Sequence, residues 1–334
     1  MTLIEYRPEP GEFCWTFGGA PPVRKVRPGD VISLWTEDCF AGKVRTERDL
    51  ASQVCEFPFL NPQTGPFAVE GAKPGDTLAL HFVSIEPARD TGAATTLPFF
   101  GALTSDAYTA TLQDPLPELV WIYELDNAKR TVTYHAKSAD LTIELPMDPM
   151  HGTVGVAPPS FEARSALVPD NHGGNLDSPE MRAGVTAYFG VNVEGALFSL
   201  GDGHARQGEG EACGTGVEVA MNTVVIVDLI PGVMTLWPRL ESDTHLMSIG
   251  AARPLENAYR VAQVDMTGWL AELCGVDRMD AYQLVAQAAL TPVAQVCNPV
   301  YTVTSKMDKS FLPSLSAYRD THTKLRELGG NLSL

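Results

Sequence analysis

Residues 72–82 read Ala-Lys-Pro-Gly-Asp-Thr-Leu-Ala-Leu-His-Phe, a turn followed by an alternating apolar segment. Proline sets φ at the first central position of such a turn, and glycine takes the positive φ that the second position requires. Leu78, Leu80 and Phe82 then alternate, which predicts one buried face of a β-strand. Residues 26–35 repeat the pattern as Val-Arg-Pro-Gly-Asp-Val-Ile-Ser-Leu-Trp. The two turn-and-strand units indicate that the N-terminal part of the chain is built from β-sheet.

Other short segments are also rich in apolar or β-branched residues, and prolines and glycines separate them. They predict strands at residues 130–136, 141–145, 185–193, 196–200, 217–229, 246–251 and 300–305. Many short strands joined by turns of this composition are typical of a sandwich or a barrel. We therefore expect a mainly β fold, with a sandwich- or barrel-like body and an α+β C-terminal portion.

The hydrophobic period changes in the last third of the chain. Apolar residues recur at spacings of three and four from Leu255 to Leu273, as on one face of a helix, and Gly275 ends the pattern. Asp277 is a suitable N-cap for a second helix that reaches about Leu290. These helices place the α+β portion after the β body.

Three parts follow from this order of elements. We expect a β-rich N-terminal domain at residues 1–165, and a β and α+β domain at residues 166–312. The second domain carries the segments rich in glycine, acids and histidine, and residues 313–334 form a peripheral C-terminal tail.

The composition describes an acidic protein with a full core. The chain has 334 residues, 44% of them hydrophobic, and 41 acidic against 24 basic residues give a net charge of −17. Nucleic acid and anionic membrane surfaces require a positive face, so neither is an expected partner. No apolar run approaches the roughly 18 residues of a membrane span, and the N-terminus lacks the pattern of a signal peptide. Six scattered cysteines without a CxxC pair predict reduced thiols and a cytoplasmic protein.

Two polar clusters flank an apolar run within residues 170–218. The first reads Asp-Asn-His-Gly-Gly-Asn-Leu-Asp at 170–177, and the second begins Gly-Asp-Gly-His at 201–204. Asp202 and His204 are two positions apart, so in a strand that continues from Leu200 their side chains point to the same side. Imidazole nitrogen and carboxylate oxygen are suitable ligands for a divalent cation, so this pair is a candidate metal site.

Other acids could join this pair. Asp177, Glu211 and Glu218 are near in sequence and could act as ligands or as a base. Glu218 lies in an apolar strand, where a buried carboxylate needs a partner. Asp38, which follows the first turn-and-strand unit, could reach the same place from far up the chain.

Several common motifs are absent from the sequence. The glycines around Gly208 and Gly210 lack the third glycine of the dinucleotide fingerprint. There is no phosphate-binding loop, no HExxH, no EF-hand spacing and no Gly-x-Ser-x-Gly elbow. Nucleotide-dependent chemistry and elbow-type serine hydrolysis are therefore not expected.

The two polar clusters together resemble the acetamidase/formamidase family. The resemblance rests on the His-Gly-Gly-Asn-Leu-Asp, Gly-Asp-Gly-His, Gly-Glu-Gly-Glu and Cys-Gly-Thr-Gly-Val-Glu segments between residues 172 and 218. It extends to Glu-Asp-Cys-Phe-Ala-Gly at 37–42, Asn-Pro-Gln-Thr-Gly-Pro at 61–66 and Gln-Val-Cys-Asn-Pro at 295–299. It therefore covers most of residues 25–312. The chain departs from the family at Glu209, commonly Asp, at Gly203, commonly bulkier, and at His151, commonly apolar.

The resemblance implies hydrolysis of a short aliphatic amide, such as formamide or acetamide, to ammonia and a carboxylate. It also implies a homo-oligomer, a dimer or trimer, and a divalent metal ion, zinc or calcium. The residues that match are Asp38, Asp177, Asp202 and His204 as metal ligands, and His172 as a further ligand or orienting group. The same match makes Glu211 or Glu218 the base that takes a proton from water.

Two other functions are compatible with the sequence. A thiol amidase could use Cys213 as nucleophile, although the surrounding acids disfavour its thiolate. A non-catalytic β protein that binds a metal or a small molecule would need the same loops without turnover.

Overall fold

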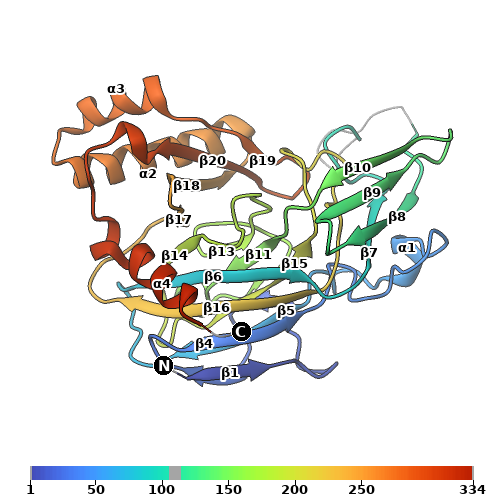
Figure 1. Cartoon of the computed structure of the whole chain (residues 1–334), viewed down its shortest axis with the longest axis horizontal. Helices are drawn as coiled ribbons and strands as arrows, with labels where there is room; N and C mark the ends of the chain where they lie inside the picture. The colour runs from blue at the N-terminus through green and yellow to red at the C-terminus, as the bar shows by residue number, and fades with distance from the viewer. Residues whose placement is uncertain (1, 105–113, 333–334) are drawn as a thin grey trace.

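The two turn-and-strand units lie in the largest sheet of the protein. In the computed structural model, which describes residues 2–104 and 114–332, they form β4 (Val31–Thr36) and β6 (Thr77–Pro87). Both strands pair antiparallel with β16 (Met221–Ile230), which lies between them. The strand order confirms the expected β fold but places a distant segment in the middle of the sheet (Figure 1).

This sheet has nine strands in the described chain. Their order is β1 (Leu3–Tyr6), β4, β16, β6, β14 (Thr186–Gly190), β17 (Arg239–Glu241), β18 (His245–Ala252), β20 (Tyr301–Asp308) and β19 (Val293–Gln295). Its strands come from both sides of residue 165, so the predicted domain boundary there does not separate two sheets. The division into domains stays a prediction.

A second sheet of five strands carries part of the glycine-rich clusters. Its order is β13 (Gly173–Asn175), β11 (Met150–Gly155), β15 (Phe198–His204), β5 (Gln63–Val69) and β3 (Arg24–Val26). The main hydrophobic core joins the two sheets, since Leu80 and Phe82 of β6 belong to the same buried cluster as Phe67 of β5 and Leu200 of β15. The body is thus a sandwich of open sheets.

Two smaller sheets and the helices complete the part of the chain that the structure describes. The first of these sheets contains β10 (Thr142–Pro146), β9 (Thr131–His135), β8 (Leu119–Asp126) and β7 (Thr91–Thr96), and the second β12 (Arg164–Ser165) and β2 (Thr16–Phe17). The helices are α1 (Ala51–Val54), α2 (Leu255–Cys274), α3 (Arg278–Ala288) and α4 (Thr321–Gly330), with 3-10 turns at Pro159–Phe161, Lys309–Phe311 and Ala317–Asp320. Among the described residues, no helix is long and apolar enough to cross a membrane.

Helices α2 and α3 confirm the two predicted C-terminal helices, and the predicted C-cap and N-cap residues lie at their ends. Gly275 ends α2 with φ of 64°, and the Asp277 carboxylate accepts a hydrogen bond from the backbone N–H of Met279 at the start of α3. Met266, Trp269 and Leu270 of α2 pack with Leu246 and other buried residues of the sheet and of α3. The α+β C-terminal portion of the expected fold is therefore present.

The predicted peripheral tail packs on the large sheet through α4. Leu325 is buried there with Ala79 and Tyr188 of the sheet. His322 is buried as well, and its Nδ1 lies 2.9 Å from the hydroxyl of Thr186 on β14. Both apolar contacts and hydrogen bonds thus hold the tail to the body.

Candidate metal centre

Strand β15 brings Asp202 and His204 together at its end. Both side chains are buried, and Asp202 Oδ1 lies 3.4 Å from His204 Nε2. Asp202 has φ of 57°, so the backbone leaves regular strand geometry at this position. The hydroxyl of Thr153 and the amide of Asn61 each donate to Asp202 Oδ2 at 2.9 Å, which fixes the carboxylate beside the imidazole.

Glu218 approaches His204 from the segment before β16. Its Oε2 lies 3.1 Å from His204 Nε2, while its Oε1 accepts a hydrogen bond of 2.8 Å from the backbone N–H of Gly216. Glu218 is 2% exposed, and Oε2 has no partner in hydrogen-bonding geometry within residues 2–104 and 114–332. A carboxylate oxygen in this state is open to a proton or a cation.

Asp177 and Glu211 approach His204 from the two predicted loops. Each of Asp177, His204 and Glu211 has a ligand atom within 4.8 Å of the others, and all three residues are buried. The amide of Asn298 donates to Asp177 Oδ2, and the thiol of Cys297 donates to Glu211 Oε2 at 3.1 Å. Asp177 Oδ1 is buried, and no described residue forms a hydrogen bond with it, which leaves it available to a cation.

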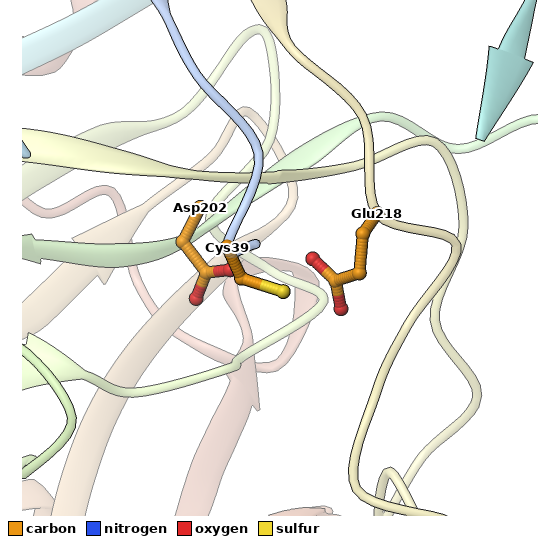
Figure 2. A group of neighbouring side chains, drawn as sticks. All are labelled: Cys39, Asp202 and Glu218. Atoms are coloured by element: carbon orange, nitrogen blue, oxygen red, sulfur yellow. The ribbon is translucent and has the colours of Figure 1, made fainter. Parts of the chain in front are cut away.

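A second group contains a residue that was not predicted. Ligand atoms of Cys39, Asp202 and Glu218 also lie within 4.8 Å of one another, and all three residues are buried. Figure 2 shows the sulfur of Cys39 pointing towards the Glu218 carboxylate, with Asp202 on its other side. The two groups are adjacent, because His204 contacts both Asp202 and Glu218.

Asp38 belongs to neither group, although it was predicted as a metal ligand. Its carboxylate accepts hydrogen bonds from the backbone N–H groups of Phe40 and Gly42 and pairs with the guanidinium of Arg89 at 2.9 Å. Arg45 lies 3.6 Å away as a further counterion. The structure therefore gives Asp38 a full set of partners outside the centre and places the neighbouring Cys39 there.

His172 also lies outside both groups. It is fully buried, and its ring meets Phe17 edge to face with the centroids 5.2 Å apart. Neither ring nitrogen has a hydrogen-bond partner among the described residues. Burial lowers the pKa of His172 to about 3. The ring is thus held neutral in apolar packing, apart from the acids that it was predicted to assist.

Burial of several acids around one histidine shifts their proton affinities. Burial raises the pKa of Asp177 well above its usual value, with a further contribution from Glu211. It also raises the pKa of Glu211 to about 8 and that of Glu218 to about 7, although His204 opposes both shifts. These shifts favour the protonated form of the three carboxyls in the metal-free centre.

The pKa shifts of Asp202 and His204 favour their charged forms. Burial disfavours the charge on His204, but Glu218 and Asp202 outweigh burial and raise its pKa well above the usual value. Burial likewise opposes the charge on Asp202, yet His204 and hydrogen bonds lower its pKa. Without a cation, the centre is therefore held together by an imidazolium–carboxylate pair.

Two glutamines hold the loops that carry these side chains. Gln207 Oε1 lies 2.9 Å from His204 Nδ1, and its amide nitrogen donates to the carbonyl oxygens of Asp177 and Ala294. Gln295 Oε1 accepts from the backbone N–H groups of Cys297 and Asn298. The sequence analysis did not predict a role for Gln207 or Gln295, nor for Asn61, which holds Asp202. Asn61 and Gln295 do belong to the segments at 61–66 and 295–299 that carry the resemblance.

Gly152 of β11 gives the carboxylates the space that they occupy. A Cβ at this position would overlap Asp177 Oδ1 and lie 2.6 Å from Asp202 Oδ2. We expect Gly152→Ala to displace both carboxylates, to cost about 1–3 kcal/mol as overpacking does, and to lower metal content. Thermal unfolding and metal analysis would check this. Gly208→Ala is the matched control, since nothing lies within 4 Å of its Cβ position, and equal effects of the two variants would contradict the prediction.

Comparison with known proteins identifies the family. The model of the Acetamidase/Formamidase family matches residues 17–163 and 160–301, which include every residue of the two groups above. The chain belongs to this family. The predicted family is thereby confirmed.

Relatives of known sequence and structure agree with this assignment. The formamidase of Methylophilus methylotrophus is 24% identical over 260 residues, which cover 63% of this chain and only 62% of the relative. The crystal structure of an acetamidase from Yersinia enterocolitica is 39% identical, with a TM-score of 0.87 and 93% of each chain covered. An acetamidase from Bacillus halodurans is 30% identical, with a TM-score of 0.82, covering 92% of this chain and 98% of the other.

Proposed function

We propose that the protein is an amidohydrolase that cleaves the C–N bond of a short aliphatic amide, formamide or acetamide, to ammonia and a carboxylate. The observation that carries the proposal is the buried centre, in which four acids, Asp177, Asp202, Glu211 and Glu218, surround His204. The names of the relatives, a formamidase and acetamidases, support the same substrate class.

The side chains of the centre fit a divalent cation. Asp177, His204 and Glu211 offer one nitrogen and carboxylate oxygens within 4.8 Å of one another, and Asp177 Oδ1 has no other partner. Three protein ligands that include an imidazole are typical of catalytic zinc, whereas calcium takes six to eight oxygens. We propose that these three residues hold zinc. When bound, zinc would acidify a water molecule and polarise the amide carbonyl.

Asp202, which was also predicted as a ligand, has a supporting role in this proposal. One of its oxygens is held by Asn61 and Thr153, and the other faces His204 at 3.4 Å. An alternative cation position is formed by Cys39, Asp202 and Glu218. This second group offers a thiol and two carboxylates but no imidazole nitrogen, which the proposed zinc ligands include.

Glu218 is the general base in the proposed reaction. Burial raises its pKa to about 7, close to the pH at which a base works best, and its Oε2 lies 3.1 Å from His204 Nε2 without a hydrogen bond in the described chain. Water attacks the carbonyl carbon while Glu218 takes its proton at Oε2. Glu218 then delivers the proton to the amide nitrogen as the C–N bond breaks, and ammonia leaves. His172 has no part in this scheme.

Metal analysis beside an ammonia-release assay tests the proposal. We expect about one zinc per chain, turnover of formamide or acetamide, and loss and recovery of turnover when zinc is removed and returned. Full activity in rigorously metal-free protein would refute the metal role. If no ammonia is released from a panel of small amides, the result would favour a non-catalytic protein that binds a metal or a small molecule.

Replacement of zinc by cobalt(II) would show which of the two groups of side chains binds the cation. A cobalt–thiolate bond would give an intense near-ultraviolet absorption that Cys39→Ser removes and Cys213→Ser leaves unchanged. We expect no such band, because the proposed ligands are Asp177, His204 and Glu211. A band that depends on Cys39 would place the ion in the other group.

Cys213→Ser tests the thiol mechanism directly. Cys213 is exposed, its thiol contacts the carbonyl oxygen of Thr215 at 3.4 Å, and it lies in neither group of the centre. We expect kcat/KM to stay within about twofold, as for most surface substitutions. Complete loss of ammonia release in a folded Cys213→Ser variant would establish the thiol amidase instead.

Assembly and location are further proposals. A homo-oligomer, dimer or trimer, is supported by exposed apolar side chains on the two C-terminal helices, among them Tyr259, Val264, Met279 and Tyr282. Light scattering of the purified protein would test it, and a monomer at micromolar concentration would refute it. The six free cysteines support the predicted cytoplasmic location.

A further inference from the structure

Gln207 makes three hydrogen bonds that define its orientation. Its Nε2 lies 2.7 Å from the carbonyl oxygen of Asp177 and 3.1 Å from that of Ala294. Carbonyl oxygens only accept hydrogen bonds, so the NH2 group of the side-chain amide must face them. The amide oxygen is therefore the atom that faces His204.

This orientation decides which nitrogen of His204 carries a hydrogen. Gln207 Oε1 lies 2.9 Å from His204 Nδ1, and an amide oxygen can only accept. Nδ1 must then donate, whether the ring is neutral or charged. In the neutral ring, the lone pair is on Nε2, the nitrogen that faces Asp202 and Glu218.

We propose that Gln207 is a positioning residue, which fixes the tautomer of His204 so that Nε2 is directed into the acid cluster. The inference rests on the proposed zinc site, and it names a residue outside the ligand set. Gln207 also ties the loop of Asp177 and the strand of Ala294 to the same histidine, so one side chain sets the relative position of two proposed ligands.

Partners that orient a metal-binding histidine through its other nitrogen typically contribute 10–100-fold in metal affinity. We therefore expect Gln207→Met, which keeps the approximate volume and removes all three hydrogen bonds, to raise the zinc Kd by about 10–100-fold. Gln207→Glu keeps an acceptor for the Nδ1 hydrogen but places a carboxylate against two carbonyl oxygens. We expect it to retain zinc affinity within about threefold while it unfolds at a lower temperature.

Gln263→Met is the matched control. Gln263 is a buried glutamine of α2 that donates to Thr291 and accepts from Ser305, and it belongs to neither group of the centre. The zinc Kd, measured by competition with a chelator on folded protein, should not change in this variant. If Gln207 were only a structural residue, both methionine variants would lower the unfolding temperature and neither would change the Kd, and that result would overturn the proposal.

A second measurement separates this inference from the proposed function. If the wild-type protein binds no zinc, the proposed function fails, and nitrogen-15 NMR of the histidine rings then decides the role of Gln207. A slowly exchanging Nδ1–H resonance of His204, assigned with His204→Asn, is expected in the wild type and in Gln207→Glu and not in Gln207→Met. Its absence from the wild type, or its persistence in Gln207→Met, would overturn the inference.

Discussion

Replacement of His204 by asparagine is expected to lower kcat/KM for formamide or acetamide by about 10²–10⁴-fold and to remove zinc from the purified protein. His204 is the only nitrogen donor in the described group with Asp177 and Glu211, and its Nε2 lies within 3.4 Å of Asp202 and 3.1 Å of Glu218. Without the imidazole, four buried acids face one another with no cationic side chain among the described members of the two groups. Steady-state ammonia release and metal analysis measure both effects.

The control for this variant is His135→Asn on β9. His135 is exposed, hydrogen-bonds Thr142 on the next strand and belongs to neither group of the centre. It should keep wild-type kcat/KM and zinc content. A folded His204→Asn protein that retains zinc and more than about a tenth of the activity would contradict the assignment of His204 as a ligand.

The metal-free protein is expected to become less stable as the pH rises from about 4.5 to about 8. The unfolded chain releases the protons of Glu218 and Glu211 near pH 4.5, whereas the folded protein holds them to about 7 and about 8. Folding therefore takes up protons in this window. For each proton that only the folded protein holds, the free energy of unfolding falls by about 1.4 kcal/mol per unit rise in pH. The raised pKa of His204 adds a decline of the same sign above its usual value of 6.5.

The zinc-loaded protein should lack this decline, because the cation takes the place of the protons and binds more tightly as the pH rises. Thermal unfolding of chelator-treated and zinc-loaded protein at pH 5, 6, 7 and 8 would measure the difference. Glu218→Gln should remove the contribution of Glu218 to the metal-free decline, which lies between about 4.5 and 7, and leave that of Glu211. Metal-free stability that is flat or rises over this range would show that the acids are not buried with raised pKa values.

Local sequence signals predicted most of the elements. The alternation at Leu78, Leu80 and Phe82, the stop at Gly275 and the cap at Asp277 all act over a few residues, so each can be recognised without the rest of the chain. The order of strands in the sheet depends on pairing between distant segments. The insertion of β16 between β4 and β6 therefore had no signal in the sequence.

In the candidate centre, too, local sequence patterns predicted some residues, whereas others depend on contacts made only in the folded protein. The glycine-rich loops drew attention to Asp177, His204 and Glu211, which the structure brings together. The choice between Asp38 and Cys39 was different. Strand β4 ends at Thr36, so alternation no longer says which neighbour points inwards, and the turn that binds the Asp38 carboxylate decides it.

The position of β16 in the large sheet has a consequence for synthesis on the ribosome. Strands β4 and β6 are complete by residue 87, yet the partner that both require is residues 221–230. Their inner edges stay open while more than a hundred further residues are translated, roughly 5–30 s at ordinary elongation rates. Open edges of apolar strands invite pairing with other chains. The nascent protein is thus expected to depend on chaperones that cover these edges until β16 emerges.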